Sequence, residues 1–243
     1  ILIQKGSQDI LVDGGPSPQA ISLELGEKLP FWDRTIELMV LTHPHADHIA
    51  GLIEVLKHYH VKQVLYADFD STSSLWLEWQ SLVSERNVKV TIAQVGQVID
   101  LGGGNPLIEV LNSPGIDEAT MDADSIVLRI SDNKISFLLT ADITEEKELE
   151  LIMERVNLDS TILKVAHHGS QTATSTGFLS VVSPQVAVIS VGADNDYGHP
   201  NNETIERLNV AVGNDNIYRT DQDGTIEFIT DGEKVWMLTE RKK

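Results

Sequence analysis

Short runs of apolar residues alternate along the chain with segments in which apolar residues recur every three to four positions. Short uninterrupted apolar runs are typical of strands that are buried on both faces, and the wider spacing is typical of amphipathic helices. The predicted helices are Pro18–Leu29, Ile49–Tyr59, a helix containing Leu75–Leu82, Glu145–Arg155 and Glu203–Leu208. The predicted strands are Ile1–Gln4, Asp9–Val12, Ile36–Leu41, Val64–Tyr66, Val88–Ala93, Val98–Leu101, Leu107–Leu111, Ser125–Ile130, Ile135–Thr140, Thr161–Ala166, Val186–Ser190, Ile217–Tyr218, Thr225–Ile229 and Val235–Leu238.

Strands with helices inserted in both halves predict two sheets that pack together, with the helices outside. No linker rich in Pro, Gly or Ser divides the 243 residues, so the pattern favours a single domain over residues 1–243. Because the sequence opens directly on an apolar strand, we expect it to be a piece of a longer protein.

The charged residues narrow the range of partners. Eighteen basic against 37 acidic side chains give a net charge of −19, which disfavours tight binding of duplex nucleic acid. Bound metal ions could still supply local positive charge. The absence of cysteine excludes thiolate ligands and nucleophiles. No apolar run approaches the roughly 18 residues that cross a bilayer, so the sequence predicts a chain that is soluble by itself.

One segment carries most of the candidate chemistry: Thr42–His48, directly after the predicted strand Ile36–Leu41, holds three histidines and an aspartate. In extended backbone, residues two apart face the same way, so His43 and His45 can hold one metal ion. Asp47 and His48 follow after the chain turns and can reach a second ion nearby. A polar turn that merely contains histidines is the less favoured interpretation.

Two later strand ends complete the set. Asp142 follows the strand Ile135–Thr140, where it can bridge two ions or cap the helix that begins at Glu145. His167 and His168 follow the strand Thr161–Ala166, and adjacent strand residues face opposite ways. The pattern therefore predicts that one of the two is a direct metal ligand, and we favour His168. His167 would then support a metal ligand through a hydrogen bond or contact the substrate.

The His-x-His-x-Asp-His run at residues 43–48, together with Asp142 and His168, resembles the metallo-β-lactamase superfamily. Asp13 matches an early acidic position that is usually a structural, hydrogen-bonding residue. The resemblance implies an α/β (α+β) fold, a four-layer αββα sandwich. It marks the superfamily strongly and the substrate weakly.

The finer pattern is similar to the β-lactamase-like domain of the ComEC competence proteins. It rests on the stretches Thr140–Ile143, Leu163–Ser170, Ser190–Gly192, Tyr197–Asn201 and Thr220–Thr225. This resemblance implies an extracytoplasmic domain of a bacterial cell-membrane protein whose channel portion lies elsewhere in the parent protein. Its implied substrate is the non-transforming single strand of DNA, which is degraded during DNA uptake while the other strand is imported. The charge of −19 predicts that this strand is bound weakly and with the help of metal.

The chain departs from the wider superfamily at one metal ligand. Many members carry a third histidine before the bridging aspartate, yet no histidine lies between His60 and His167. In the corresponding stretch, Asp124 offers an oxygen ligand in place of this histidine. We therefore expect two divalent ions, with Mn²⁺ favoured and Zn²⁺ as the alternative.

These residues predict a metal-dependent hydrolase, a DNA exonuclease or other phosphodiesterase, in which a water activated by two metals attacks phosphorus. We expect His199, or alternatively His167, to contact phosphate or to protonate the leaving group. Ser170 is expected to contact phosphate or to cap the segment beyond it. Asp47 is expected to take part in catalysis as well as in metal binding. Two other classes stay open: a hydrolase of a carbonyl substrate (lactone, thioester or β-lactam) and a non-catalytic DNA-guiding domain. The sequence leaves the oligomeric state open.

Overall fold

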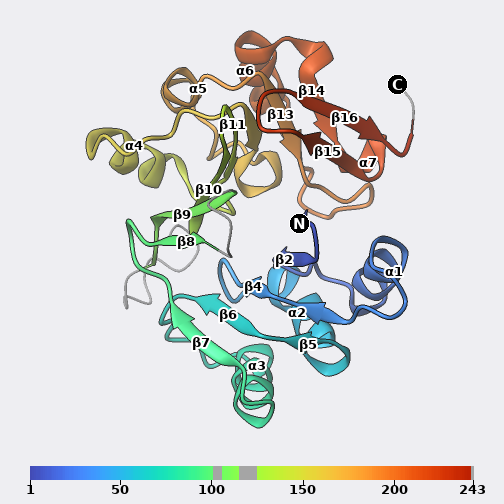
Figure 1. Cartoon of the computed structure of the whole chain (residues 1–243). Coiled ribbons are helices and arrows are strands. Elements are labelled where there is room, and N and C mark those ends of the chain that lie inside the picture. The colour runs from blue at the N-terminus through green and yellow to red at the C-terminus, as the bar shows by residue number, and fades with distance from the viewer. Residues whose placement is uncertain (101–105, 115–124, 242–243) are drawn as a thin grey trace. The chain divides into compact units, whose positions relative to one another are not determined.

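The computed structural model describes residues 1–100, 106–114 and 125–241. These residues form two compact units, shown as a colour-ramped ribbon in Figure 1. The N-terminal unit comprises Ile1–Gln94, and the C-terminal unit comprises Val95–Ser113 and residues 125–241. Each unit has its own sheet, so each is described by itself.

The N-terminal unit is built on a five-stranded sheet with the strand order β1-β2-β4-β6-β7. A second, two-stranded sheet pairs β3 with β5. The elements of this unit are β1 (Leu2–Lys5), β2 (Gln8–Val12), α1 (Pro18–Lys28), β3 (Thr35–Ile36), β4 (Leu38–Val40), α2 (Ala46–His58), β5 (His60–Val61), β6 (Gln63–Tyr66), α3 (Ser74–Glu85) and β7 (Lys89–Ile92).

Strands β2, β4, β6 and β7 run parallel, and only β1 is antiparallel, joined to β2 by a tight hairpin. Parallel strands need crossover connections, which here are the helices α1, α2 and α3. Helix α2 contacts both α1 and α3, so the three helices form one layer. As a result, the carboxyl ends of β2 and β4 lie next to each other at one edge of the sheet.

Two glycines bring the loop after β2 directly against helix α2. The Gly14 N–H donates to the His48 carbonyl at 2.8 Å, and the Gly51 N–H donates to the Gly15 carbonyl at 3.0 Å. A Cβ at Gly51 would lie 2.0 Å from the Gly14 carbonyl oxygen, and one at Gly14 would lie 2.2 Å from the Leu52 nitrogen. Only glycine allows this backbone-to-backbone contact.

The C-terminal unit is built on a seven-stranded sheet with the strand order β14-β13-β12-β11-β10-β9-β8, and a separate hairpin pairs β15 with β16. Its elements are β8 (Val98–Asp100), β9 (Leu107–Asn112), β10 (Val127–Asp132), β11 (Ile135–Leu139), α4 (Glu145–Met153), β12 (Ile162–Lys164), the 3-10 helix η2 (Ala166–Gly169), α5 (Thr176–Val182), β13 (Val186–Ile189), α6 (Asn202–Val212), the 3-10 helix η3 (Asn214–Asn216), β14 (Ile217–Arg219), α7 (Thr220–Asp223), β15 (Ile226–Thr230) and β16 (Val235–Thr239).

Strands β11 to β14 of this sheet are parallel, and β8 to β11 are antiparallel. Buried side chains from the strands and from helices α4, α5 and α6, among them Leu163, Phe178 and Leu208, form one apolar cluster. The loops after β11, β12 and β13 leave the sheet at the same edge, the usual place for ligand sites in sheets of this kind.

The predicted strand Ile36–Leu41 is divided in the structure. It forms β3 and β4 with Glu37 between them, because the Glu37 N–H donates to the Asp9 carbonyl instead of continuing one ladder. Helix α2 begins at Ala46, three residues before the predicted start at Ile49, so Asp47 and His48 belong to its first turn.

The prediction was wrong around the strand Thr161–Ala166. Strand β12 ends at Lys164, and His167 and His168 lie in the short helix η2, so the alternation of strand side chains does not apply to them. Helix α5 was not predicted from the sequence. Its seven residues are too few for the periodic pattern to stand out.

Across residues 1–100, 106–114 and 125–241, no helix combines the length and the apolar character that crossing a membrane requires. The candidate ligand Asp124 lies outside the described residues.

The glycine contact can be tested by a matched pair of substitutions. Gly51→Ala should lower the free energy of unfolding by ~3 kcal/mol, because the methyl group would push two backbones apart. Gly26→Ala, on exposed helix α1 with nothing within 4 Å of the new Cβ, should be neutral or raise stability. Urea unfolding followed by circular dichroism measures both; equal stability of the two variants would contradict the close contact.

Candidate metal centre

In the N-terminal unit, all five candidate residues lie where parallel strands end. Asp13 directly follows β2, and the segment Thr42–His48 links β4 to helix α2. His45 caps the amino end of α2 through its extended backbone, and Asp47 lies in the first turn. The helix start therefore turns the chain back, so that His43, before it, and His48, inside it, lie together.

Asp13 is the centre of the hydrogen bonds in this loop. Its Oδ1 accepts the Thr42 N–H at 2.9 Å. Its Oδ2 accepts the Thr42 hydroxyl and the His48 Nδ1–H, each at 2.8 Å. Since the Thr42 hydroxyl proton is used on Asp13, His43 Nδ1, 3.1 Å from Thr42 Oγ1, acts as a donor. Both histidines thus use Nδ1 as the donor within this loop.

The three imidazoles of this segment are in direct contact. The ring centroids of His43 and His48 are 3.9 Å apart, and those of His43 and His45 are 4.7 Å apart. His43 is fully buried, and the side chain of Asp47, which is 45% exposed, places Oδ2 3.6 Å from His48 Nε2. Protonating several rings at this separation would be unfavourable, whereas neutral rings can share a cation.

Burial alone would raise the pKa of Asp13. The neighbouring His48 and His43 and the Thr42 N–H outweigh burial and hold the pKa of this carboxyl below its ordinary value. Asp13 is therefore ionised at neutral pH and fixes the orientation of His48.

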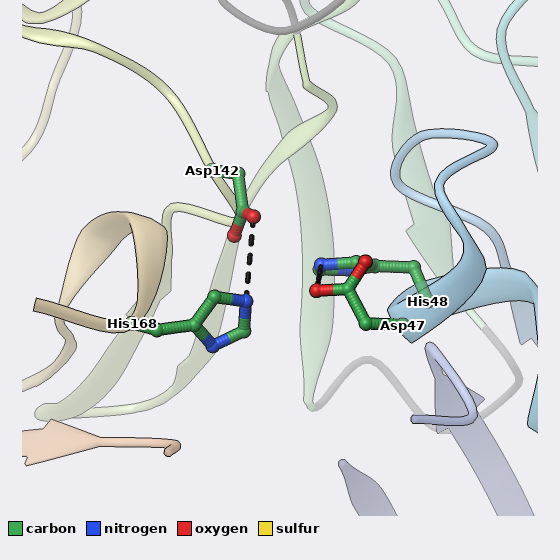
Figure 2. Close-up of side chains that lie close together, drawn as sticks. All are labelled: Asp47, His48, Asp142 and His168. Atoms are coloured by element: carbon green, nitrogen blue, oxygen red, sulfur yellow. Dashed lines mark ion pairs between the residues drawn. The ribbon is translucent and has the colours of Figure 1, made fainter. Parts of the chain in front are cut away.

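In the C-terminal unit, Asp142 follows β11 and His168 lies in η2 after β12. Figure 2 shows both side chains, with the ion pair between them drawn as a dashed line, and also the Asp47–His48 pair. His168 Nε2 lies 3.3 Å from Asp142 Oδ2. Its Nδ1–H donates to the Ser190 carbonyl at 2.7 Å, at the end of β13. His168 therefore repeats the arrangement of His48: Nδ1 is bound by a protein oxygen, and Nε2 faces a carboxylate.

The backbone is unusual at these loops. Asp13, Ala141, His167 and His168 all have positive φ values, between 45° and 55°, where residues other than glycine are strained. In the C-terminal unit this conformation is held by two bonds to the Ala141 carbonyl, one from the His167 N–H and one from Lys164 Nζ. Backbone strain of this kind is common at functional sites, where the surrounding contacts must offset its energetic cost.

Lys164 is a residue that the sequence analysis missed. It is buried at the end of β12 and donates to the carbonyls of Ala141 and Val165, so it ties the loop of Asp142 to the end of β12, directly before η2. The available signal was a charged residue at the end of an apolar strand, beside the predicted ligands. The hydrogen bond from His168 to the Ser190 carbonyl could not be predicted, because every residue has a backbone carbonyl whatever its side chain.

His167 and His199 lie close together in the C-terminal unit, with their ring centroids 5.8 Å apart. His199 is fixed through its backbone: its N–H donates to Asn195 Oδ1, and its carbonyl accepts from Asn195 Nδ2. Burial, then the nearby His167 and His168, lower the pKa of His199. At neutral pH its ring is neutral and can donate one N–H.

The structure also bears on the capping roles considered possible for Asp142 and Ser170 from the sequence. The N-cap position of α4 is Thr144, which makes no capping bond through its side chain, so the interpretation of Asp142 as the cap is wrong. Ser170 Oγ accepts the Thr172 N–H and contacts the Thr172 hydroxyl, so it caps the segment beyond it.

The profile of the Metallo-beta-lactamase superfamily matches residues 1–193, and the chain belongs to this superfamily. The metallo-β-lactamase fold is also seen in the metallo-beta-lactamase fold protein YhfI from Bacillus subtilis, with a TM-score of 0.57 at 15% identity, over 90% of this chain and 86% of that one. The mixed α/β metallo-β-lactamase fold expected from the resemblance is thereby confirmed.

Two relatives support the resemblance to the ComEC competence proteins. ComE operon protein 3 of Bacillus subtilis is 32% identical over 84% of this chain, and Recombination protein 2 of Haemophilus influenzae is 30% identical over 85%. Both are ComEC-type proteins, which confirms the resemblance found in the sequence. The chain covers 26% and 24% of their lengths, about a quarter of each.

The residues present fit the divalent ions that this fold implies. Imidazole nitrogens and carboxylate oxygens are ligands for Zn²⁺ and Mn²⁺. In both units a histidine donates its Nδ1–H to a protein oxygen, the arrangement that metal-bound histidines usually adopt. In both units its Nε2 then faces a carboxylate oxygen, and a cation between these two atoms would satisfy both.

We predict that Asp13→Asn weakens binding of Mn²⁺ by about 10- to 100-fold, because an amide cannot accept from both His48 and Thr42. Isothermal titration calorimetry measures the affinity. Glu24→Gln, on the exposed side of helix α1, removes the same charge elsewhere in this unit and should leave the affinity unchanged. Equal affinities for all three proteins would contradict the positioning of His48 by Asp13.

Proposed function

We propose that this chain is a metal-dependent nuclease that hydrolyses phosphodiester bonds in single-stranded DNA. The observation that carries the proposal is the repeated histidine arrangement: His48 and His168 each have Nδ1 held by an oxygen and Nε2 beside a carboxylate. The names of the competence-type relatives favour DNA as substrate, in the setting of DNA uptake.

In this proposal residues 1–243 form a single domain that binds two divalent ions. His43, His45, Asp47 and His48 of the N-terminal unit would be metal ligands, and so would Asp142 and His168 of the C-terminal unit. When bound, the two ions supply a water of lowered pKa and neutralise charge on the phosphate. Mn²⁺ is favoured over Zn²⁺, because the chain lacks a further histidine between His60 and His167.

The protein residues then position the substrate. His199 is neutral at pH 7, and its N–H can donate to a phosphate oxygen or to the leaving oxygen. His167 lies beside it and is the alternative donor. Asp47, partly exposed at the start of α2, orients the attacking water in addition to binding metal.

The net charge of −19 limits how strongly the protein can bind DNA. A strongly acidic protein repels a polyanion at long range, so binding depends on the ions and on short-range contacts. We therefore propose weak binding of one strand. The complete protein would present this domain outside the cytoplasm beside a membrane channel, as the resemblance to the ComEC competence proteins implies.

Purified protein with Mn²⁺ should degrade a labelled single-stranded oligonucleotide, and EDTA should abolish the reaction. His48→Ala and Asp142→Ala should each lower the rate by at least about 100-fold, since a lost ligand costs more than a lost outer partner. Gel electrophoresis of the strand measures this, and His58→Ala, a surface histidine at the end of α2, is the control.

Two outcomes would overturn the nuclease assignment. Turnover of nitrocefin or of a lactone with intact DNA would favour a hydrolase of carbonyl substrates. Bound metal without turnover of any of these substrates would favour a DNA-guiding domain without catalysis.

The role of His199 predicts a particular dependence on pH. Because its pKa is lowered, the His199 ring stays neutral below the usual histidine range, so kcat should show no change that is due to His199 above about pH 6.5. His199→Ala should lower kcat by about 100-fold, and His199→Gln, which keeps an N–H donor, should lose less. Initial rates between about pH 5 and pH 8 measure both effects; an unchanged kcat in His199→Ala would exclude the role.

A further inference from the structure

The loop after β13 carries an aromatic ring whose exposure the proposed chemistry does not explain. Tyr197 is 84% exposed, although it lies two residues from His199. Its ring is nearly parallel to the His199 ring, with an interplanar angle of 18° and a centroid separation of 5.9 Å. An aromatic ring this exposed and this close to a candidate site has a free face for a flat ligand.

The loop that holds Tyr197 is braced by the polar contacts of Asn195. Asn195 Nδ2 donates to the carbonyls of Gly192 and His199, and Asn195 Oδ1 accepts the His199 N–H. Gly198, between the two rings, has a φ of 70°, which lets the chain turn there. These bonds fix the backbone on both sides of Tyr197, so its ring can be placed at a lower entropic cost than on a mobile loop.

The Tyr197 ring neighbours the candidate phosphate donors. The His199 ring centroid lies 5.9 Å from that of Tyr197 and 5.8 Å from that of His167, whose centroid is 6.4 Å from that of His168. A nucleotide whose phosphate contacts His199 or His167 therefore has its base within reach of Tyr197. Asp194 and Asp196 are exposed in the same loop and disfavour a phosphate there, whereas an uncharged base is not repelled.

We propose that Tyr197 and His199 form a stacking platform for the terminal nucleobase of a single strand. This inference rests on the proposed function and adds what the site recognises beyond phosphate. Stacking on an aromatic ring is tolerant of base identity, so the platform selects for a nucleotide end without selecting a sequence. Tyr197 is thus a specificity-determining residue, and it also compensates for the weak electrostatic attraction of an acidic protein.

Two oligonucleotides that differ only in the terminal base test the platform: one ends in thymidine, and the other ends in an abasic tetrahydrofuran nucleotide. Tyr197→Ala should raise KM for the thymidine-ended strand about tenfold, because base–aromatic stacking is lost. It should leave KM for the abasic-ended strand and kcat for both strands unchanged. Tyr197→Phe and Tyr197→Trp should restore the low KM, and Trp236→Ala, an exposed aromatic on β16 of the same unit, should match the wild type.

A second measurement does not need turnover. A strand ending in 2-aminopurine should lose fluorescence on binding in the presence of Ca²⁺, because stacking quenches this base, and Tyr197→Ala should abolish the quenching.

The possible results separate the two proposals. If the wild type cleaves both strands and Tyr197→Ala affects them equally, or neither, the platform is overturned and the nuclease stands. If the wild type cleaves neither strand, the nuclease fails, and quenching that depends on Tyr197 would still support the platform. Absence of both cleavage and quenching would overturn both.

Discussion

The fixed orientation of two imidazole rings is the constraint on which the candidate centre depends. His48 is held through Nδ1 by Asp13, and His168 is held through Nδ1 by the Ser190 carbonyl. In each case the remaining nitrogen faces an aspartate. Without these hydrogen bonds each ring could rotate. Fixing the ring would then cost free energy on metal binding and weaken the affinity for metal.

The rest of each unit can be understood as support for these rings. In the N-terminal unit, the glycine contact between the loop of Asp13 and helix α2 brings Asp13 within hydrogen-bond distance of His48. In the C-terminal unit, Lys164 and the His167 N–H converge on the Ala141 carbonyl and hold the loop that presents Asp142. Both sets of contacts stabilise residues with positive φ next to the candidate ligands, where backbone strain is typical of functional sites.

The family and its coarse chemistry were predictable, because the run from His43 to His48 and the strand-end Asp142 are local patterns. The position of His199 near His167 was suggested only by resemblance, and its lowered pKa depends on neighbours that are distant in the sequence. The strand assignment of His167 and His168 failed for a physical reason: hydrogen bonds from another strand end stabilise a strained turn that local propensity disfavours.

The sequence by itself determined which residues are candidates for binding metal and roughly where most strands lie, since both follow from the order of the side chains along the chain. The tertiary structure decided which nitrogen of each histidine is presented, because Asp13 and the Ser190 carbonyl come from elsewhere in the fold. It also decided that Tyr197 is exposed beside His199, since exposure depends on what the rest of the fold leaves uncovered.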